Sequence, residues 1–536
     1  MQKRTVIHIL EVVLGVAIGA MVTFSIVRYR EKQHLIRSQY TDWRKLNLIL
    51  DIVEKNYVDT VNMEGMTDAA VTAALAKLDP HSVYLPPVQL EASEQELAGN
   101  FDGIGIQFNV PNDTAIVLEV IAGGPSEKVG LQPGDRLLKV DDKVIAGVKF
   151  PQDSMVSRIK GPSGSKVVIT VKRGADVIPF EITRGKIPVH SMDAAFMVRP
   201  GVGYLRLGKF SRTTYKECHT AAMELLDQGM AHLIFDIRDN TGGYMDQALL
   251  LSNDFLSSGD TIVYLEGKHR AKEVYKADGS GQLQSVKLSV LISENSASAS
   301  EIFAGAIQDN DRGTVVGRRS FGKGLVQEPF FFTDKSGIRL TVARYYTPSG
   351  RCIQKPYGDT RTDYSYDIYR RYADGEVFSA DSVKLNKEDV HYTRGGRVVY
   401  GGGGIMPDVF VPMDTTRASA FFIACNRKAT QMRFASDIFD RHTGALSKID
   451  SFPQMDAFLA GLNLKADFLA YAKKKDGITC TPAEWEATES YLVPQLKALI
   501  ARYSKLGDNA FYKYYLPVDE TVNKALELIS NPAEQQ

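Results

Sequence analysis

The stretch LSVLISENSASASEIFAGAIQDN, residues 288–310, decides the fold class of this chain. Its apolar start, Leu288–Ser293, predicts a short buried strand. A polar turn follows, and the residues from Ala299 to Asn310 predict a helix that begins in the serine-rich run Ser296–Glu301. A strand that leads straight into a helix is the building unit of an α/β layer.

The same alternation continues on both sides of this stretch. The predicted strands are Gly203–Leu207, His232–Arg238, Leu288–Ser293 and Thr314–Gly317, and the predicted helices are Thr214–Gln228, Met245–Phe255 and Ala299–Asn310. Such alternation is typical of an α/β fold with crossover connections. We therefore expect an α/β core over residues 187–415. Residues 356–404 interrupt it with a Tyr- and charge-rich surface excursion that ends in four glycines, Gly401–Gly404.

The segments that flank this core have a different texture. Residues 31–97 predict helices, which the prolines of the stretch Leu78–Pro86 interrupt. Residues 98–186 are β-rich, and residues 416–536 are again helical. With residues 1–30 as a separate segment, the chain of 536 residues divides into five parts, as expected for a multi-domain length.

Charge and cysteine content exclude several classes of protein. Lys plus Arg and Asp plus Glu both number 64, so the basic excess of a nucleic-acid-binding protein is missing. The four cysteines are far apart and form no C-x-x-C pair, which excludes a disulfide scaffold and a thiolate zinc site. We expect no nucleic-acid partner, no metal and no organic cofactor.

The N-terminus predicts a membrane anchor. After Lys3 and Arg4, the residues from Val6 to Val27 are mainly apolar, and at ~1.5 Å per residue they span about 33 Å, enough to cross a bilayer core. A cleaved signal peptide is the alternative. We favour a retained anchor because Arg28 follows immediately and no A-x-A cleavage motif is present. Basic residues at both ends leave the orientation undecided.

The β-rich module carries a candidate binding loop. Gly103-Ile104-Gly105-Ile106 opens a strand, and the turn Gly130–Asp135 follows at the spacing of a PDZ domain, which residues 98–186 resemble. Such glycines let backbone N–H groups converge on a carboxylate, and the strand edge beside them accepts a peptide. We expect the loop to bind protein C-termini, with Ile104 and Ile106 as apolar walls that favour a hydrophobic last residue. A Gly-rich hairpin of another small barrel is the alternative.

Ser298 is the first candidate catalytic residue. At the start of a helix, its side chain meets the positive end of the helix dipole, which favours negative charge on an attacking oxygen. The same residue belongs to the pattern Ser298-x-x-Glu301, a capping box that requires no catalysis. Taken alone, this stretch favours the cap.

Lys323 changes that balance. It lies between two glycines and among apolar side chains, where burial lowers the pKa of an amine from ~10.4 to the ~7–8 that a general base needs. If the segment to Gln327 is extended, both side chains lie on one face and the Gln327 carboxamide orients the amine. The pattern from Gly317 to Lys323 also matches the start of a phosphate-binding loop. However, Gly324 stands where that loop needs Ser or Thr.

The third element is the predicted strand end Asp236–Gly243. Its Gly242-Gly243 turn presents a bare N–H to a substrate carbonyl oxygen, although a strand-to-helix turn that needs glycine for its dihedral angles is the simpler interpretation. No G-x-S-x-G or H-E-x-x-H motif is present, so the histidines do not indicate a His-based triad or a zinc protease.

Together these segments resemble the carboxy-terminal processing, or tail-specific, serine proteases. The motifs are Ser296–Glu301, Phe321–Gln327, Arg238–Gly243, Leu78–His81 and Tyr345–Arg351, within residues 40–412. The resemblance implies that Ser298 is the nucleophile and Lys323 the general base, assisted by Gln327. It implies an oxyanion hole made of the backbone N–H groups of Ala299 and Gly243. It also implies a crotonase-like (ClpP-like) α/β core with an inserted PDZ domain.

The sequence therefore predicts a membrane-anchored serine endopeptidase that cleaves proteins after PDZ recognition of their C-termini. We expect it in the bacterial inner membrane with its catalytic part on the periplasmic side, or free in the periplasm if the first segment is cleaved. Its partners would be protein substrates with free, hydrophobic C-termini and, through residues 1–30, the membrane, while homo-oligomerisation stays open. Two alternatives remain: a catalytically silent PDZ scaffold in which Ser298 only caps a helix, and an acyl-chemistry enzyme of the crotonase kind.

Overall fold

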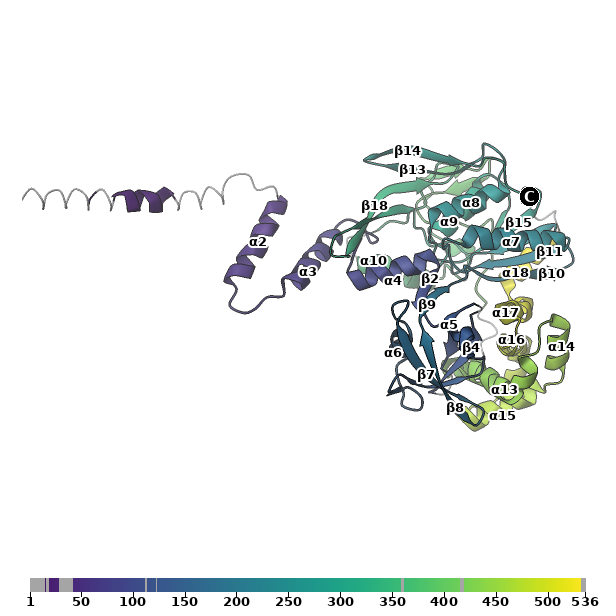
Figure 1. Ribbon diagram of the computed structural model, residues 1–536. Helices are drawn as coiled ribbons and strands as arrows, with labels where there is room; N and C mark the ends of the chain where they lie inside the picture. The colour runs from purple at the N-terminus through teal and green to yellow at the C-terminus, as the bar shows by residue number, and fades with distance from the viewer. Residues whose placement is uncertain are drawn as a thin grey trace, which may run out of the picture. The chain divides into compact units, whose positions relative to one another are not determined.

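The computed structural model describes residues 15, 19–27, 42–110, 113–121, 123–357, 361–414 and 419–531 (Figure 1). Residues up to Leu75 form one compact unit, and the residues from Ala76 onward form another. In the first unit, residues 19–27 are helical, and α2 (Asp42–Asn56) and α3 (Met63–Leu75) follow. Most of the predicted anchor, Val6–Val27, lies outside the described residues. Within the described ranges, no helix combines the length and the apolarity needed to cross a bilayer.

The predicted interruption of the helical region before residue 98 is confirmed. β1 (Val83–Leu85) follows the Asp79-Pro80 turn, and α4 (Pro87–Ala98) leads into the β-rich module. β1 pairs antiparallel with β18 (Gly337–Tyr346), more than 250 residues further along the chain. The turn at Asp79 is thereby brought to the catalytic part of the molecule.

The β-rich module has its own hydrophobic core. Its elements are β2 (Asn100–Gly103), β3 (Ile106–Asn109), β4 (Ala115–Val120), α5 (Pro125–Lys128), β5 (Arg136–Val140), β6 (Lys143–Val144), α6 (Gln152–Ile159), β7 (Lys166–Arg173), β8 (Asp176–Thr183) and β9 (Gly185–Pro188). Strands β3-β4-β5-β7-β8 form one antiparallel sheet, and β2 pairs with β9 where the chain enters and leaves. Alternate side chains of β7 (Val167, Ile169 and Val171) are buried, as expected for a half-covered strand.

The predicted α/β core is confirmed. Its sheet has the order β10-β11-β12-β15-β16-β21, and all neighbours are parallel except β10, which is antiparallel to β11. The elements are β10 (Met192–Arg199), β11 (Val202–Leu207), α7 (Thr214–Asp227), β12 (His232–Asp236), α8 (Met245–Phe255), β15 (Lys287–Ile292), α9 (Ala299–Asp309), β16 (Thr314–Gly317) and β21 (Val409–Phe410). The bounds of the predicted elements agree with these to within two residues.

The central strands of this sheet are covered on both faces. On β12, Leu233 and Phe235 belong to the core shared with α7, α8 and α9, which lie on one side of the sheet (Figure 1). Ile234 points to the opposite face and packs with the last helix, α18 (Glu520–Ser530). A strand covered on both faces is apolar at successive positions, which explains the run from Leu233 to Phe235.

A second sheet carries the hairpin that follows Lys323. Its order is β1-β18-β13-β14, with β17 paired to β18, and its further elements are β13 (Thr261–Gly267), β14 (Arg270–Lys276) and β17 (Leu325–Phe331). The strand predicted after Lys323 is therefore confirmed, whereas a phosphate-binding loop would require a helix there.

The Tyr-rich excursion packs onto the core. Its elements are α10 (Arg361–Ser365), α11 (Asp367–Ala373), the 3₁₀ helix η1 (Ala380–Ser382), β19 (Val390–Tyr392) and β20 (Val398–Tyr400). Arg371 of α11 is buried and pairs with Glu376. It also donates to the carbonyl oxygens of Arg319 and Ser320, at 2.6 and 3.0 Å. The excursion therefore supports the chain just before Lys323.

The C-terminal part is helical, as predicted. Its elements are α12 (Ala420–Arg427), α13 (Thr430–Leu446), α14 (Phe452–Ala460), α15 (Leu464–Tyr471), the π-helical turn η2 (Ala472–Asp476), α16 (Pro482–Ala501), α17 (Gly507–Tyr515), the 3₁₀ helix η3 (Leu516–Val518) and α18. Helices α12 to α16 share one hydrophobic core, to which Ile116 of β4 also contributes. Because α18 covers the catalytic sheet instead, the C-terminal helices contribute to two separate cores.

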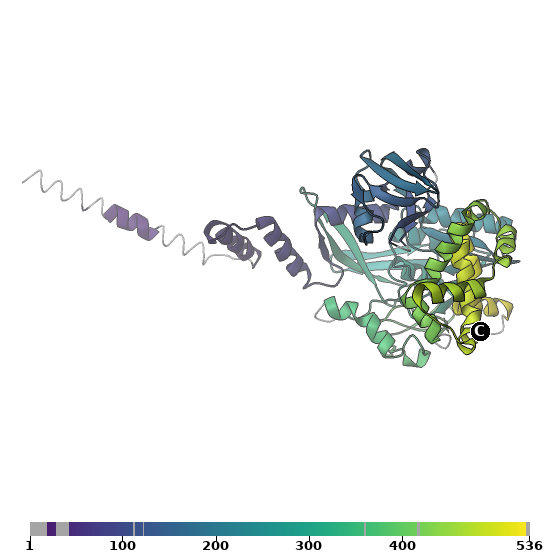
Figure 2. The same cartoon turned by 90° about the horizontal axis from the view of Figure 1, so that it is seen from below.

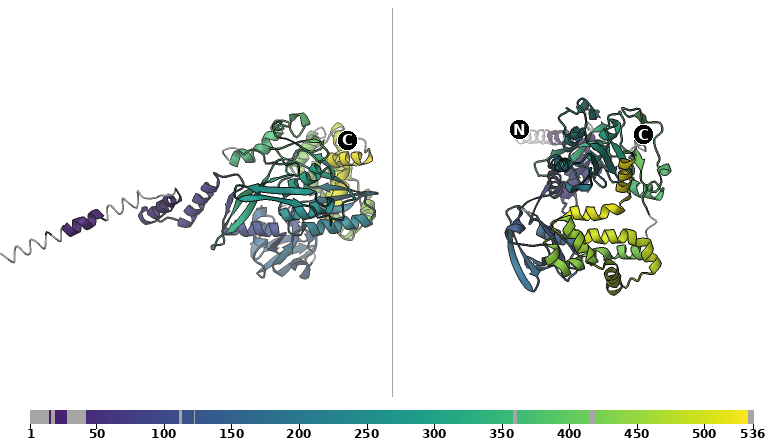
Figure 3. Two further views of the ribbon diagram at one scale, coloured as in Figure 1. Left: turned by 90° about the horizontal axis from the view of Figure 1, so that it is seen from above. Right: turned by 90° about the vertical axis from the view of Figure 1, so that its right-hand side faces the viewer.

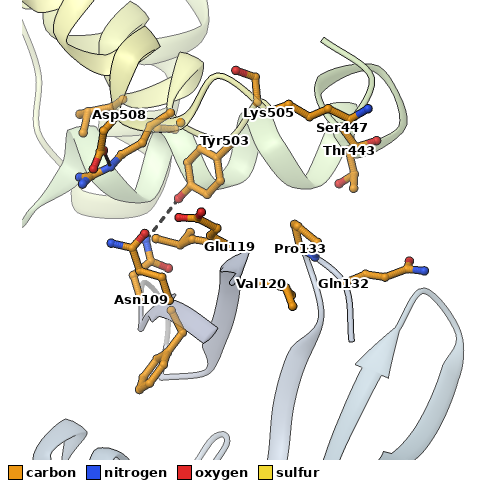
Figure 4. A pocket seen from close by; sticks show the side chains of 18 of the residues that line it. Asn109, Glu119, Val120, Gln132, Pro133, Thr443, Ser447, Tyr503, Lys505 and Asp508 are labelled. Atoms are coloured by element: carbon orange, nitrogen blue, oxygen red, sulfur yellow. Dashed lines mark hydrogen bonds and ion pairs between the residues drawn. The ribbon is translucent and has the colours of Figure 1, made fainter. Parts of the chain in front are cut away.

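The C-terminal helices contact the β-rich module (Figures 2 and 3). Asn109 donates a hydrogen bond to Tyr503 at 3.3 Å, and Arg136 pairs with Asp440. A cavity of about 730 Å³ lies between the two parts, lined by Asn109 and Glu119 from the module and by Tyr503 from the helices, among others (Figure 4). The module is thus attached to the helices around a hollow interface.

Asp519 joins the same helices to the segment after β12. Its carboxylate accepts two hydrogen bonds from the Arg238 guanidinium, at 2.9 and 2.8 Å, and caps α18 by accepting from Val522 N–H. Asp236 accepts from the same guanidinium and from Arg206. Two carboxylates therefore balance two largely buried guanidinium groups.

We predict that Asp519→Ala destabilises the catalytic core, because Arg238 loses one of its two carboxylate partners in a buried site. The expected cost is about 3 kcal/mol, which for a core of this size lowers the thermal midpoint in scanning calorimetry by about 6–12 °C. Asp374→Ala is the matched control, because the Asp374–Lys384 pair is exposed on both sides and contributes little. Equal shifts for the two variants would contradict this reading of the Arg238 site.

Candidate active site

Three segments predicted from the sequence meet at one cavity of about 560 Å³. Its lining includes Ser298 at the start of α9, Lys323 in the loop between β16 and β17, Gln327 of β17, and Gly243 between β12 and α8. The strands β12, β15 and β16 are parallel neighbours, so the loops that follow them reach the same edge of the sheet. Parallel pairing is what brings residues 55 or more positions apart into one site.

Ser298 has a strained backbone. Its φ and ψ are 57° and −113°, in a region that non-glycine residues rarely adopt. The N–H of Ser298 donates to the Glu301 carboxylate at 2.9 Å, and the Glu301 N–H donates to the carbonyl oxygen of Ser298 at 2.8 Å. Because that N–H has a backbone acceptor, the start of the helix does not depend on the Ser298 hydroxyl.

Glu301 connects the helix to the lysine loop. Its buried carboxylate also accepts from the Ser320 hydroxyl at 2.5 Å and from the N–H groups of Gly322 and Lys323, at 2.7 and 2.9 Å. Burial raises the pKa of Glu301, and these donors act in the opposite direction. The sequence assigned Glu301 only to a capping box. The signal that was missed is a carboxylate on a helix whose other faces are apolar.

Lys323 is placed in surroundings that disfavour its charge. Burial, together with the nearby Arg339 cation, lowers the pKa of Lys323 to about 8, while Glu301 and Asp79 act in the opposite direction. Its carbonyl oxygen accepts from the Tyr345 hydroxyl at 2.5 Å, and the same hydroxyl lies 3.2 Å from the carbonyl oxygen of Ser298. Tyr345 and Glu301 therefore both hold the two backbones together.

The Gly242-Gly243 turn approaches Ser298 too closely for any side chain. A Cβ atom at Gly242 would lie 2.8 Å from Ser298 Cβ and 2.9 Å from the Ala299 nitrogen, and one at Gly243 would lie 2.0 Å from the Phe210 oxygen. Among the backbone hydrogen bonds of the described residues outside helices and strands, none uses the N–H of Gly243 or Ala299. Two bare donors thus lie next to the serine.

Gln327 lies on β17 at a register irregularity that follows Val326. Its Nε2 donates to Thr341 Oγ1 at 3.3 Å. In the described part of the chain, no hydrogen bond joins the side chains of Ser298, Lys323 and Gln327 to one another. Such contacts are often long in sites without substrate and tighten when it binds.

The residues of the predicted carboxylate-binding loop lie apart from this cavity, in the β-rich module. Gly103 ends β2, Gly105 has a φ of 78°, and Ile106 begins β3. Ile104 is only 1% exposed and belongs to the core of the module, so its side chain is not an open wall. Of the two isoleucines, Ile106 alone is partly accessible.

Potential metal ligands and the histidines offer no second centre. Over the described ranges, no group of three or more His, Cys, Asp or Glu residues is arranged to hold a metal ion. Burial lowers the pKa of His232 to about 4, and its Nε2 pairs with the Ser289 hydroxyl at 3.0 Å. His81 pairs with the Tyr364 hydroxyl at 3.0 Å.

Three family models match the chain. Residues 201–364 match peptidase family S41, residues 103–183 match the PDZ domain, and residues 421–504 match a family of unknown function (DUF8443). The first match contains Ser298, Lys323 and Gly243, and the second contains the Gly103–Ile106 loop.

Named relatives agree with these matches. A protein of Staphylococcus epidermidis called "Probable CtpA-like serine protease" is 32% identical over 352 residues, which is 65% of this chain and 71% of that protein. A protein of the same name from Staphylococcus aureus is 32% identical over 321 residues, 60% of this chain and 64% of that protein. Among solved structures, the photosystem II D1 C-terminal processing protease is 26% identical with a TM-score of 0.36, over 70% of this chain and 94% of that one.

Proposed function

This chain belongs to peptidase family S41, as a CtpA-like serine protease of the carboxy-terminal processing kind with a PDZ domain, and we propose that Ser298 is its nucleophile and Lys323 its general base. The observation that carries the proposal is the shared cavity. Both residues line it, and Glu301 and Tyr345 bind the backbones of both.

The proposed reaction begins with attack of Ser298 Oγ on a substrate peptide carbonyl carbon. As the O–C bond forms, the hydroxyl proton passes to the neutral Lys323 amine, which a pKa near 8 keeps partly unprotonated at neutral pH. The carbonyl oxygen becomes an oxyanion that the N–H groups of Gly243 and Ala299 stabilise.

The tetrahedral intermediate then collapses. The C–N bond breaks, the leaving amine takes the proton from Lys323, and an acyl-enzyme ester remains on Ser298. A water molecule repeats the sequence, with Lys323 accepting its proton and returning one to Ser298 Oγ. Gln327 would orient the amine through both steps.

The PDZ domain would select the substrates. We propose that the Gly103–Ile106 loop binds a free C-terminal carboxylate and that Ile106 contacts a hydrophobic last side chain. A protein held by its tail is present at a high effective concentration near the catalytic cavity. This accounts for a binding module and a catalytic core in one chain.

Three further predictions stay proposals. A crotonase-like description of the core is supported by the crossovers from β12 through α8 to β15 and from β15 through α9 to β16. The five-part division, with boundaries after residues 30, 97, 186 and 415, is supported by the separate hydrophobic cores of the module and of helices α12–α16. Anchoring of residues 1–30 in the inner membrane, with the protease on the periplasmic side, is supported by the apolar run from Val6 to Val27.

We predict that Ser298→Ala and Lys323→Ala each lower kcat/KM for an unstructured polypeptide with a free hydrophobic C-terminus by at least ~10³-fold. Each change removes one partner of the proton transfer while leaving the PDZ loop intact. Cleavage is measured by mass spectrometry, which also identifies the new termini. Lys384→Ala, which removes an exposed lysine, is the control and should stay active. Undiminished cleavage by the Ser298→Ala protein would reject the mechanism. An inactive wild-type protein that still binds the tail would favour the silent PDZ scaffold.

The acid limb of the pH–rate profile should report the Lys323 amine. Because the neutral form is the base, kcat/KM rises with pH through about 8. Arg339→Gln removes a cation that lowers this pKa, so the limb moves to higher pH. Arg441→Gln, an exposed arginine of α13, should leave the limb in place. A limb that moves to lower pH in Arg339→Gln would contradict the assignment.

Capture of the C-terminus can be measured without cleavage, using the Ser298→Ala protein. A peptide that ends in a free hydrophobic residue should bind at least ~10-fold more tightly than its C-terminal amide, because the backbone donors of the loop need a negative acceptor. Fluorescence anisotropy gives both dissociation constants. Equal affinities would rule out carboxylate recognition.

A further inference from the structure

We propose that Asp79 and Thr341 are positioning residues, which fix the Gln327 carboxamide so that its oxygen faces the Lys323 amine. The inference rests on the proposed function, since it concerns the group that orients the base. It assigns a role to the Leu78–His81 turn, which the catalytic steps above do not use.

Asp79 is held rigidly at the turn before β1. Its side chain is 8% exposed and accepts four hydrogen bonds. Oδ1 receives the N–H groups of His81 and Ser82, at 2.8 and 3.0 Å, and the Thr341 hydroxyl at 3.0 Å, while Oδ2 receives the Ser82 hydroxyl at 2.5 Å. A carboxyl surrounded by four donors acts only as an acceptor.

Thr341 is therefore left with a single role toward Gln327. A threonine hydroxyl has one hydrogen, and here that hydrogen is used on Asp79. The Thr341 N–H donates to Ser82 Oγ at 3.1 Å, which keeps the residue against the turn. The oxygen of the hydroxyl can then only accept.

The orientation of Gln327 follows from this. Gln327 and Thr341 are partners across the β17–β18 hairpin, so their side chains lie on the same face of the sheet. The carboxamide must turn its NH₂ toward Thr341, at 3.3 Å, because the opposite orientation would bring two acceptors together. Its Oε1 then points the other way and is available to the amine of Lys323, which lines the same cavity.

This orientation suits a lysine base. An amide oxygen that accepts one N–H of the neutral amine leaves the nitrogen lone pair free for the Ser298 proton. A carboxamide turned by 180° would present its own N–H groups and would compete with Ser298 for that lone pair. The Asp79 charge also acts on the base directly, since it raises the pKa of Lys323 against burial and Arg339.

The test is a cycle of variants measured with the cleavage assay. Thr341→Val keeps the shape of the side chain and removes the hydroxyl, so kcat should fall about 5–10-fold with little change in KM. Thr341→Ser restores the hydroxyl and should recover activity to within about threefold. In a Gln327→Ala background, Thr341→Val should have no further effect, because Thr341 acts through Gln327.

Asp79→Asn provides a second readout that a purely structural role would not move. Removing the negative charge should lower the pKa of Lys323, so the acid limb of kcat/KM moves to lower pH, opposite to the shift expected for Arg339→Gln. Thermal midpoints of all variants show whether the fold is kept.

Either of two outcomes overturns the inference: a full Thr341→Val effect that persists in the Gln327→Ala background, or unchanged kcat in Thr341→Val or in Gln327→Ala alone. These results are distinguishable from failure of the proposed function, which would appear as cleavage that survives Ser298→Ala or Lys323→Ala.

Discussion

The buried carboxylate of Glu301 is the interaction on which the catalytic arrangement depends. It accepts the N–H groups of Ser298, Gly322 and Lys323 and the hydroxyl of Ser320. A buried carboxylate is tolerated only where donors surround it, so its burial fixes how closely the lysine loop approaches α9. One side chain thereby sets the distance between the proposed nucleophile and the proposed base.

The same dry surroundings set the chemistry of the amine. Burial lowers the pKa of Lys323, the Arg339 cation lowers it further, and the carboxylates of Glu301 and Asp79 oppose both. These three charged groups come from β18, from α9 and from the turn before β1, respectively. The protonation of the amine is therefore a property of the assembled fold, and none of these segments could set it alone.

Much of this architecture could be predicted from the sequence, because its signals are local. The bounds of α8 and β16 match the predicted ones, and the motifs around Ser298, Lys323 and Gly243 lie at one cavity. Long-range roles could not be predicted. Ser-x-x-Glu fits a capping box whether or not the carboxylate reaches a loop about 20 residues away, and no local pattern links Asp79 to Thr341 across 262 positions. The helical periodicity near the C-terminus indicates an apolar face but not the sheet that this face covers.

The location of α18 has a consequence for biosynthesis. The outer face of the parallel strands, which includes Ile234, Leu291 and Val316, is covered by a helix that begins at Glu520. Translation delivers the chain from its N-terminus, so a ribosome has already released both proposed catalytic residues when this face still lacks its cover. Nascent enzyme therefore carries an incomplete catalytic sheet until nearly all of its codons have been read, which delays its maturation to the end of synthesis.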